Sequence, residues 1–176
     1  MFVKPQISKE QAEEILSSQR GLFSFQFRKA TLLRVELVFL PCYLFTILLN
    51  QNREEREIQV TIDGIQGSFA LFQDRGIQFT DRPEAEFFKF QLSSQEAREK
   101  ALEVCRGQLI RWGFRKRHPS QIKGVVEQKK VGYPYWVGYF KRKEAYDFKL
   151  IDAVSGSLQG IPMRRLLLVA FRQAKK

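Results

Sequence analysis

The sequence predicts an α+β fold of two pseudo-repeated units, each a helix plus an antiparallel β-hairpin, with a C-terminal helix packed on the sheet. The prediction rests on helix starts, strand pairs and terminal turns that recur in the same order at offsets of 85 to 93 residues. We expect the units to span residues 1–88 and 89–176 and to form one compact domain, because 176 residues lie within the usual size range of a single domain. The second unit would carry a basic surface and the C-terminal helix.

The helix starts carry matching capping boxes. Ser8 is followed three residues later by Gln11, and Ser93 by Glu96. In such a box each serine and its partner satisfy one another's backbone amides at the start of a helix. Apolar residues then follow at helical spacing in both segments. The pattern continues over more residues in the second segment, so we expect the second helix to be the longer. A third, amphipathic helix is predicted from Pro162 to Ala174.

The strand segments are apolar and end in tight turns. Residues 37–49 form an apolar run that would cover only about 20 Å as a helix, short of the roughly 30 Å hydrocarbon core, so we interpret it as a buried strand. Pro41 and Pro134 cannot donate to a sheet ladder and are expected at a strand start, an edge or a bulge. Asp63 and Asp152 each precede a glycine in a turn motif, so we interpret them as turn-forming residues rather than catalytic acids.

Charge is distributed unevenly along the chain. The formal net charge is +11; residues 1–105 contain 13 Lys+Arg against 15 Asp+Glu, whereas residues 106–176 contain 17 against 4. An excess of this kind indicates an anionic partner such as an acidic protein, a nucleic acid or an anionic membrane surface. A solvated, solubilising face is the alternative interpretation.

Basic residues in the second half alternate with aromatic ones. The predicted polyanion-binding residues are Arg111, Arg115, Lys116, Arg117, Lys129, Lys130, Lys141, Arg142 and Lys143. Tyr133, Tyr135 and Tyr139 lie at strand spacing and could stack on nucleic-acid bases, with a place in the core as the alternative.

Signals for catalysis are scarce. The one histidine, His118, lies in a basic segment without an identifiable partner, and the chain has no phosphate-binding glycine loop and no nucleophile motif. Cys42 and Cys105 are too few and too far apart for a common zinc site, so we expect reduced structural thiols in a cytoplasmic protein with no metal or cofactor. The first residues resemble no signal peptide, and the oligomeric state is left open.

The segments Ser8–Leu16 and Leu150–Leu158, a helix and a strand closing with Asp-Ala-Val-Ser-Gly, resemble the PepSY family. That resemblance implies a non-catalytic regulatory or inhibitory module, often in tandem. The sequence therefore predicts a non-catalytic interaction module that binds an acidic protein or other polyanion through its basic second half. The rival hypothesis is sequence-nonspecific nucleic-acid binding, and a small enzyme with an unrecognised site is the third.

Overall fold

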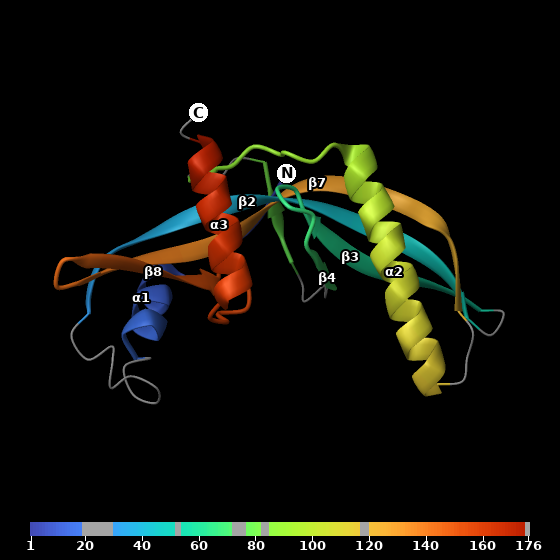
Figure 1. The fold of residues 1–176 in the computed structure, drawn as a ribbon, viewed down its shortest axis with the longest axis horizontal. Helices are drawn as coiled ribbons and strands as arrows, with labels where there is room; N and C mark the ends of the chain where they lie inside the picture. Colours follow the sequence, from blue (N-terminus) through green and yellow to red (C-terminus); the bar gives the residue numbers. More distant parts are fainter. Residues whose placement is uncertain (19–29, 52–53, 72–76, 82–84, 117–119, 175–176) are drawn as a thin grey trace. The chain divides into compact units, whose positions relative to one another are not determined.

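The computed structural model describes residues 1–18, 30–51, 54–71, 77–81, 85–116 and 120–174 (Figure 1). The elements of this part of the chain are, in order, β1 (Phe2–Val3), α1 (Lys9–Ser18), β2 (Thr31–Gln51), β3 (Glu54–Asp63), β4 (Phe69–Leu71), β5 (Phe79–Thr80), β6 (Glu86–Phe87), α2 (Ser94–Lys116), β7 (Ser120–Arg142), β8 (Ala145–Asp152) and α3 (Ile161–Ala174). Both helices and sheet are present, as predicted, and the second helix is longer than the first.

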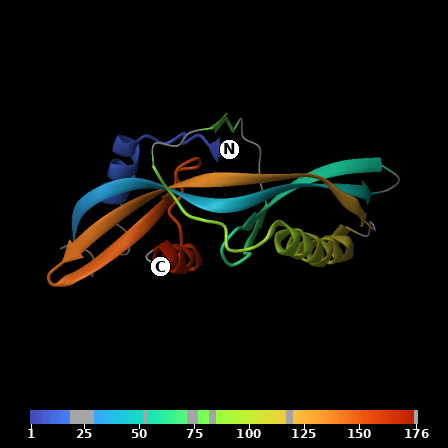
Figure 2. The ribbon, with the colours of Figure 1, turned by 90° about the horizontal axis from the view of Figure 1, so that it is seen from above.

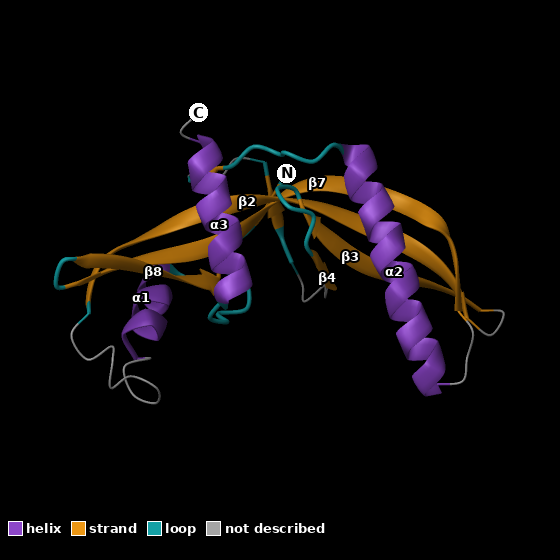
Figure 3. Cartoon of the chain, viewed as in Figure 1, coloured by secondary structure: helices purple, strands orange, loops and turns teal. Residues whose placement is uncertain are grey.

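One large mixed sheet joins all the strands described. Its order is β4-β3-β2-β7-β1-β5, with β6 beside β2 and β8 beside β7. The strands β2 and β7, of 21 and 23 residues, far exceed the usual strand of about 5–6 residues (Figure 3). Residues along β2 pair first with β6 and then with β3, while β7 pairs with β1 and then with β8.

The prediction of two helix-plus-hairpin repeats is therefore wrong. The chain has one long sheet, and its contacts divide it into two units that each draw on both halves of the sequence. Unit 1 comprises residues 1–40, 77–88 and 132–176, and unit 2 comprises residues 41–76 and 89–131. As a result, α1 shares a unit with the β7–β8 hairpin, and α2 shares a unit with the β2–β3 hairpin.

In unit 1 the core lies on both faces of the sheet. Ala12 and Leu16 of α1 pack against Trp136, Phe140 and other apolar residues of the strands. The C-terminal helix α3 lies on the opposite face of these strands, as the two views show (Figures 1 and 2). Its buried residues are Leu166, Leu167 and Ala170. The apolar pattern from Pro162 to Ala174 thus predicted both the helix and its packing on the sheet.

In unit 2 the core lies between α2 and the strands β2 and β3. The helix contributes four buried residues at successive steps of four, which places them along one side of the helix. They are Ala97, Ala101, Cys105 and Leu109. The strands contribute large side chains, among them Tyr43, Phe45 and Ile62, each fully buried. The predicted buried strand at residues 37–49 is confirmed as part of β2.

Both capping boxes form as predicted. The amide of Gln11 donates to Ser8 Oγ over 3.2 Å, and the amide of Ser8 donates to Gln11 Oε1 over 2.8 Å. The same two bonds, with the same lengths, join Ser93 and Glu96 at the start of α2. These bonds satisfy backbone donors that would otherwise lack a partner at a helix start.

The aspartate turns also form as predicted. Asp63 accepts the amides of Ile65, Gln66 and Ser68 on its carboxylate, and Gly67 has a φ of 83°. In the second turn, Asp152 accepts the amides of Val154 and Ser155, and Gly156 has a φ of 73°. Both aspartates are thus occupied by turn hydrogen bonds.

Pro41 and Pro134 lie inside β2 and β7, not at the start of either strand. The carbonyl of Pro41 accepts the amide of Gly64, and that of Pro134 accepts the amide of Ala153. The N–H and C=O of one strand residue point to the same edge. On that edge, β2 changes its partner from β6 to β3 near Pro41, and β7 changes its partner from β1 to β8 near Pro134. A proline is tolerated there because the ladder is interrupted at that point.

No helix in the described part of the chain combines the length and the apolar character needed to cross a membrane.

Candidate functional site

Cations and aromatic rings gather where β7 turns into β8 in unit 1. We call this set the cation–aromatic surface; its members are Arg34, Tyr139, Lys141, Tyr146, Phe148 and Arg164. The β7–β8 ladder places Tyr139 directly opposite Phe148, and Lys141 directly opposite Tyr146. Neighbouring rows of one ladder therefore carry the rings of this surface.

Arg34 and Glu36 approach the surface from β2. The guanidinium carbon of Arg34 lies 4.8 Å from the centre of the Tyr139 ring, and Arg34 Nη2 lies 2.7 Å from Glu36 Oε2. The Tyr139 hydroxyl donates to Glu36 Oε1. The Arg34 side chain is 66% exposed while that of Glu36 is 27% exposed, so the carboxylate is the more buried partner of the pair.

This arrangement favours the protonated form of Tyr139. Burial raises the pKa of its phenol, and the neighbouring Glu36 carboxylate, as hydrogen-bond partner and as a negative charge, raises the pKa further. The Arg34 charge acts in the opposite direction and is outweighed. Tyr139 is therefore a hydrogen-bond donor here and is not suited to act as a general base at neutral pH.

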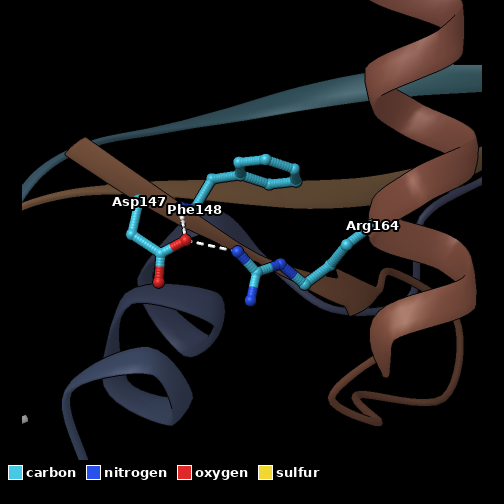
Figure 4. A network of polar contacts seen from close by, with 3 residues as sticks. All are labelled: Asp147, Phe148 and Arg164. Carbon is cyan, nitrogen blue, oxygen red and sulfur yellow. Dashed lines mark hydrogen bonds and ion pairs between the residues drawn. The ribbon is translucent and has the colours of Figure 1, made fainter. Parts of the chain in front are cut away.

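Arg164 reaches the surface from α3 (Figure 4). Its Nη2 donates to Asp147 Oδ1, and its guanidinium carbon lies 5.0 Å from the centre of the Phe148 ring. The same Asp147 oxygen accepts the amide of Phe148 over 2.9 Å. A second arginine is thus held over an aromatic ring by a carboxylate, as Arg34 is held over Tyr139.

Lys141 and Tyr146 form the row of the cation–aromatic surface that lies nearest the β7–β8 turn. The ammonium nitrogen of Lys141 lies 5.9 Å from the ring centre of Tyr146, whose residue is 72% exposed. Lys143, also exposed, takes a positive φ of 51° in the β7–β8 turn. This row can be reached from solvent.

The chemistry of the surface is recognition of anionic or planar groups. A guanidinium has five N–H donors in a fixed fork, so one carboxylate leaves donors available to a second anion. An aromatic ring on one side limits the conformers of the cation and leaves its other face open for stacking. Among the described residues, no three His, Cys, Asp or Glu side chains are placed to hold a metal ion.

The structure distributes the predicted polyanion-binding residues over both units. Lys141, Arg142 and Lys143 belong to unit 1 and the other six to unit 2. In unit 2, Lys129 Nζ lies 2.7 Å from Glu127 Oε1, and Lys130 Nζ lies 5.4 Å from the ring centre of Phe90.

Arg111 is exposed near the end of α2. Arg115 and Lys116 lie on the same helix, and Arg142 lies on β7, but their side chains are not among those described. Arg117 and His118 fall outside the described residues.

The three predicted stacking tyrosines are half-buried and already engaged. The Tyr133 hydroxyl donates to the Asp152 carboxylate at 3.1 and 3.2 Å, and the Tyr133 and Tyr135 rings lie 5.3 Å apart. Tyr139 bonds Glu36 and lies under Arg34. Of this row, Tyr139 is the member that belongs to the cation–aromatic surface.

Folding removes the charge asymmetry seen along the sequence. The segments of unit 1 contain 16 Lys+Arg and 10 Asp+Glu, and those of unit 2 contain 14 and 9, so the units carry +6 and +5. Sequence reasoning missed Arg34 because it lies in the acidic half, and missed Arg164 because its helix was expected only to pack on the sheet. The spacing of Arg34 and Glu36, two apart on a strand, was the available signal.

Comparison with known proteins found no matching family model, no matching curated protein and no matching solved structure.

Proposed function

We propose that the chain is a non-catalytic interaction module that binds an acidic segment of a partner protein through the cation–aromatic surface. The observation that carries this proposal is the placement of Arg34, Lys141 and Arg164 each over its own aromatic ring at one end of unit 1.

Restraint of the two arginines supports binding of carboxylates. A free arginine side chain loses roughly 2 kcal/mol of rotamer entropy when it is fixed. Arg34 and Arg164 are already held by Glu36 and Asp147, so these side chains would lose less rotamer entropy when a carboxylate binds. Charge-assisted bonds to a carboxylate are the strong polar contacts available to such groups.

The charge of the whole chain supports the same class of partner. Each unit carries a formal positive charge, +6 and +5, which attracts an acidic segment before contact and speeds its association. This attraction is screened at high ionic strength.

Single-stranded nucleic acid is the second candidate, favoured by the exposed ring of Tyr146 and the ring-backed guanidinium planes. Stacking of a base on an aromatic side chain contributes about 1–3 kcal/mol and tolerates any sequence. A nucleic acid would also exploit Lys141 and Lys143 as phosphate contacts.

The test measures fluorescence anisotropy of two labelled probes over a salt series, with protein purified after nuclease treatment. One probe is an Asp/Gly peptide, chosen because neither residue favours a strand; the other is oligothymidylate. The variant combines Arg34→Ser, Lys141→Ser and Arg164→Ser. Its control is Arg98→Ser, which removes an exposed cation on α2.

We expect the peptide to bind the unaltered protein and the triple variant to bind it at least about tenfold more weakly, with Arg98→Ser unchanged. Tighter binding of oligothymidylate than of the peptide, lost in the same variant, would replace the proposal by the second candidate. If the triple variant retains full affinity, or if neither probe binds at low salt, the surface has no role in binding polyanions.

A further inference from the structure

The first half of β7, residues 121–130, carries a strand edge that pairs with no other described strand. On one side β7 neighbours β2. On its other side, β1 pairs at Gly132 and β8 pairs from Tyr135 to Arg142. We propose that this edge, in unit 2, adds an extended acidic segment of a partner protein as a further strand. Such strand addition uses backbone hydrogen bonds for affinity and side chains for selectivity.

The chain closes a comparable edge elsewhere. Along the outer edge of β8, the amide of Phe148 donates to Asp147 and the carbonyl of Leu150 accepts the amide of Gln159 over 2.8 Å. Further on, the amide of Asp152 donates to the carbonyl of Ser157 over 2.9 Å. Natural proteins cover edges in this way because open edges pair with other chains. No described residue provides similar backbone bonds to the β7 edge.

The strand that carries this edge is anchored to the core, and part of its surface is exposed. Ile122 and Val125 pack against the core beneath α2, and the Gln128 side chain donates to the carbonyl of Ser94 over 3.3 Å. In contrast, Val126 is 54% exposed, and a methyl group built on Gly124 would meet no atom within 4 Å. A partner strand would therefore meet a preformed backbone and little obstruction.

Charge selects the occupant. Lys123 and Lys130 are exposed, and Lys129 is half-buried beside Glu127. In a second copy paired antiparallel about Val126, Lys123 would lie opposite Lys129, and like charges in directly opposed positions are destabilising. An extended segment with acidic side chains complements the same lysines, so the lysines favour this partner over self-association.

The inference does not depend on the proposed function, because its residues lie in unit 2 and not on the cation–aromatic surface. The probe is a peptide of alternating Glu and Val, a composition that permits a strand. Two further peptides carry N-methyl groups on alternate residues, one set on the even and one on the odd positions. Each removes the amide donors along one edge only and leaves the side chains unchanged.

We expect the plain peptide to bind and to slow amide exchange within residues 121–130 by at least about tenfold. One N-methylated peptide should bind like the plain peptide and the other at least about tenfold more weakly, because an added strand bonds through one of its edges. Lys123→Glu should weaken binding, whereas Arg98→Glu, the same charge change on α2 of the same unit, should not.

Equal binding of both N-methylated peptides would overturn the inference, because backbone pairing would then contribute nothing. Protection that appears only in unit 1 would also overturn it, and would leave the proposed function intact. Concentration-dependent protection of residues 121–130 without peptide would show that a second copy of the chain, not an acidic segment, occupies the edge.

Discussion

Removal of the Tyr43 hydroxyl tests whether the start of α2 packs on the β2–β3 hairpin. Tyr43 is fully buried on β2, and its hydroxyl donates to the carbonyl of Leu92, one residue before the capping serine of α2, over 2.7 Å. Tyr43→Phe removes that hydroxyl and keeps the ring, which also packs edge-to-face on Phe90 at 4.8 Å between centres.

The expected cost is about 1–2 kcal/mol of unfolding free energy. A hydrogen bond contributes about 0.5–1.5 kcal/mol net, and a buried carbonyl left without its partner adds a desolvation penalty of about 1–3 kcal/mol when water cannot replace the donor. The Leu92 residue is only partly buried, so we take the lower part of the combined range. For a chain of this size, the same change corresponds to a fall in Tm of about 2–8 °C.

Equilibrium unfolding in urea measures the effect, with Tyr146→Phe as the matched control. Tyr146 loses the same atom from a residue that is 72% exposed, so its unfolding free energy should change by less than about 0.5 kcal/mol. Equal losses in the two variants would refute the reasoning, because the hydroxyl of Tyr43 would then have no special partner in the folded protein.

Two further predictions concern packing and protons. A methyl group on Gly138 would lie 2.5 Å from Leu16 Cδ1 of α1, so Gly138→Ala should lower the free energy of unfolding in urea by about 1–3 kcal/mol. The control, Gly124→Ala, adds a methyl group with no atom within 4 Å and should lower it far less. Equal effects of the two substitutions would argue against the packing of α1 on β7. Burial raises the pKa of the Cys105 thiol to about 11 from 9.0. The folded protein therefore keeps a proton that the unfolded chain loses, and the stabilisation present below about pH 9 falls by about 1.4 kcal/mol per pH unit as the pH rises towards 11. Unfolding in urea across this pH range should show a shallower decline for Cys105→Ala, and parallel curves for the two proteins would contradict the assignment.

Features that depend on neighbouring residues could be predicted from the sequence. The capping boxes at Ser8 and Ser93 close within three residues, and the turns at Asp63 and Asp152 close within five. Their hydrogen bonds join groups that any local chain conformation keeps close together, so composition and spacing specify them.

Strand length and pairing could not be predicted in the same way. Residues 120–131 are rich in polar and charged side chains and gave no strand signal, yet they form the first half of β7. Their strand conformation comes from pairing with β2, which lies far away in the sequence. Strand preference is decided largely by such neighbours, so a polar segment becomes a strand once a partner ladder is available.

The candidate site shows the same division. Lys141 and Tyr139 were identified from their place in a basic, aromatic segment, but Arg34 and Arg164 join them from β2 and from α3. More than a hundred residues separate Arg34 from Tyr139 along the chain. The sheet brings these two residues together, and no local sequence pattern predicts that contact.

The sequence by itself determined the helix starts, the turns, the buried apolar segment at residues 37–49 and the overall positive charge, because each follows from residue type over a short span. Tertiary structure alone decided which helix shares a unit with which hairpin, and how the positive charge is divided between the units. The physical reason is that β2 and β7 each continue from one unit into the other. Residues distant in sequence therefore meet through hydrogen bonds between strands, and the sequence of one strand does not specify which strand it pairs with.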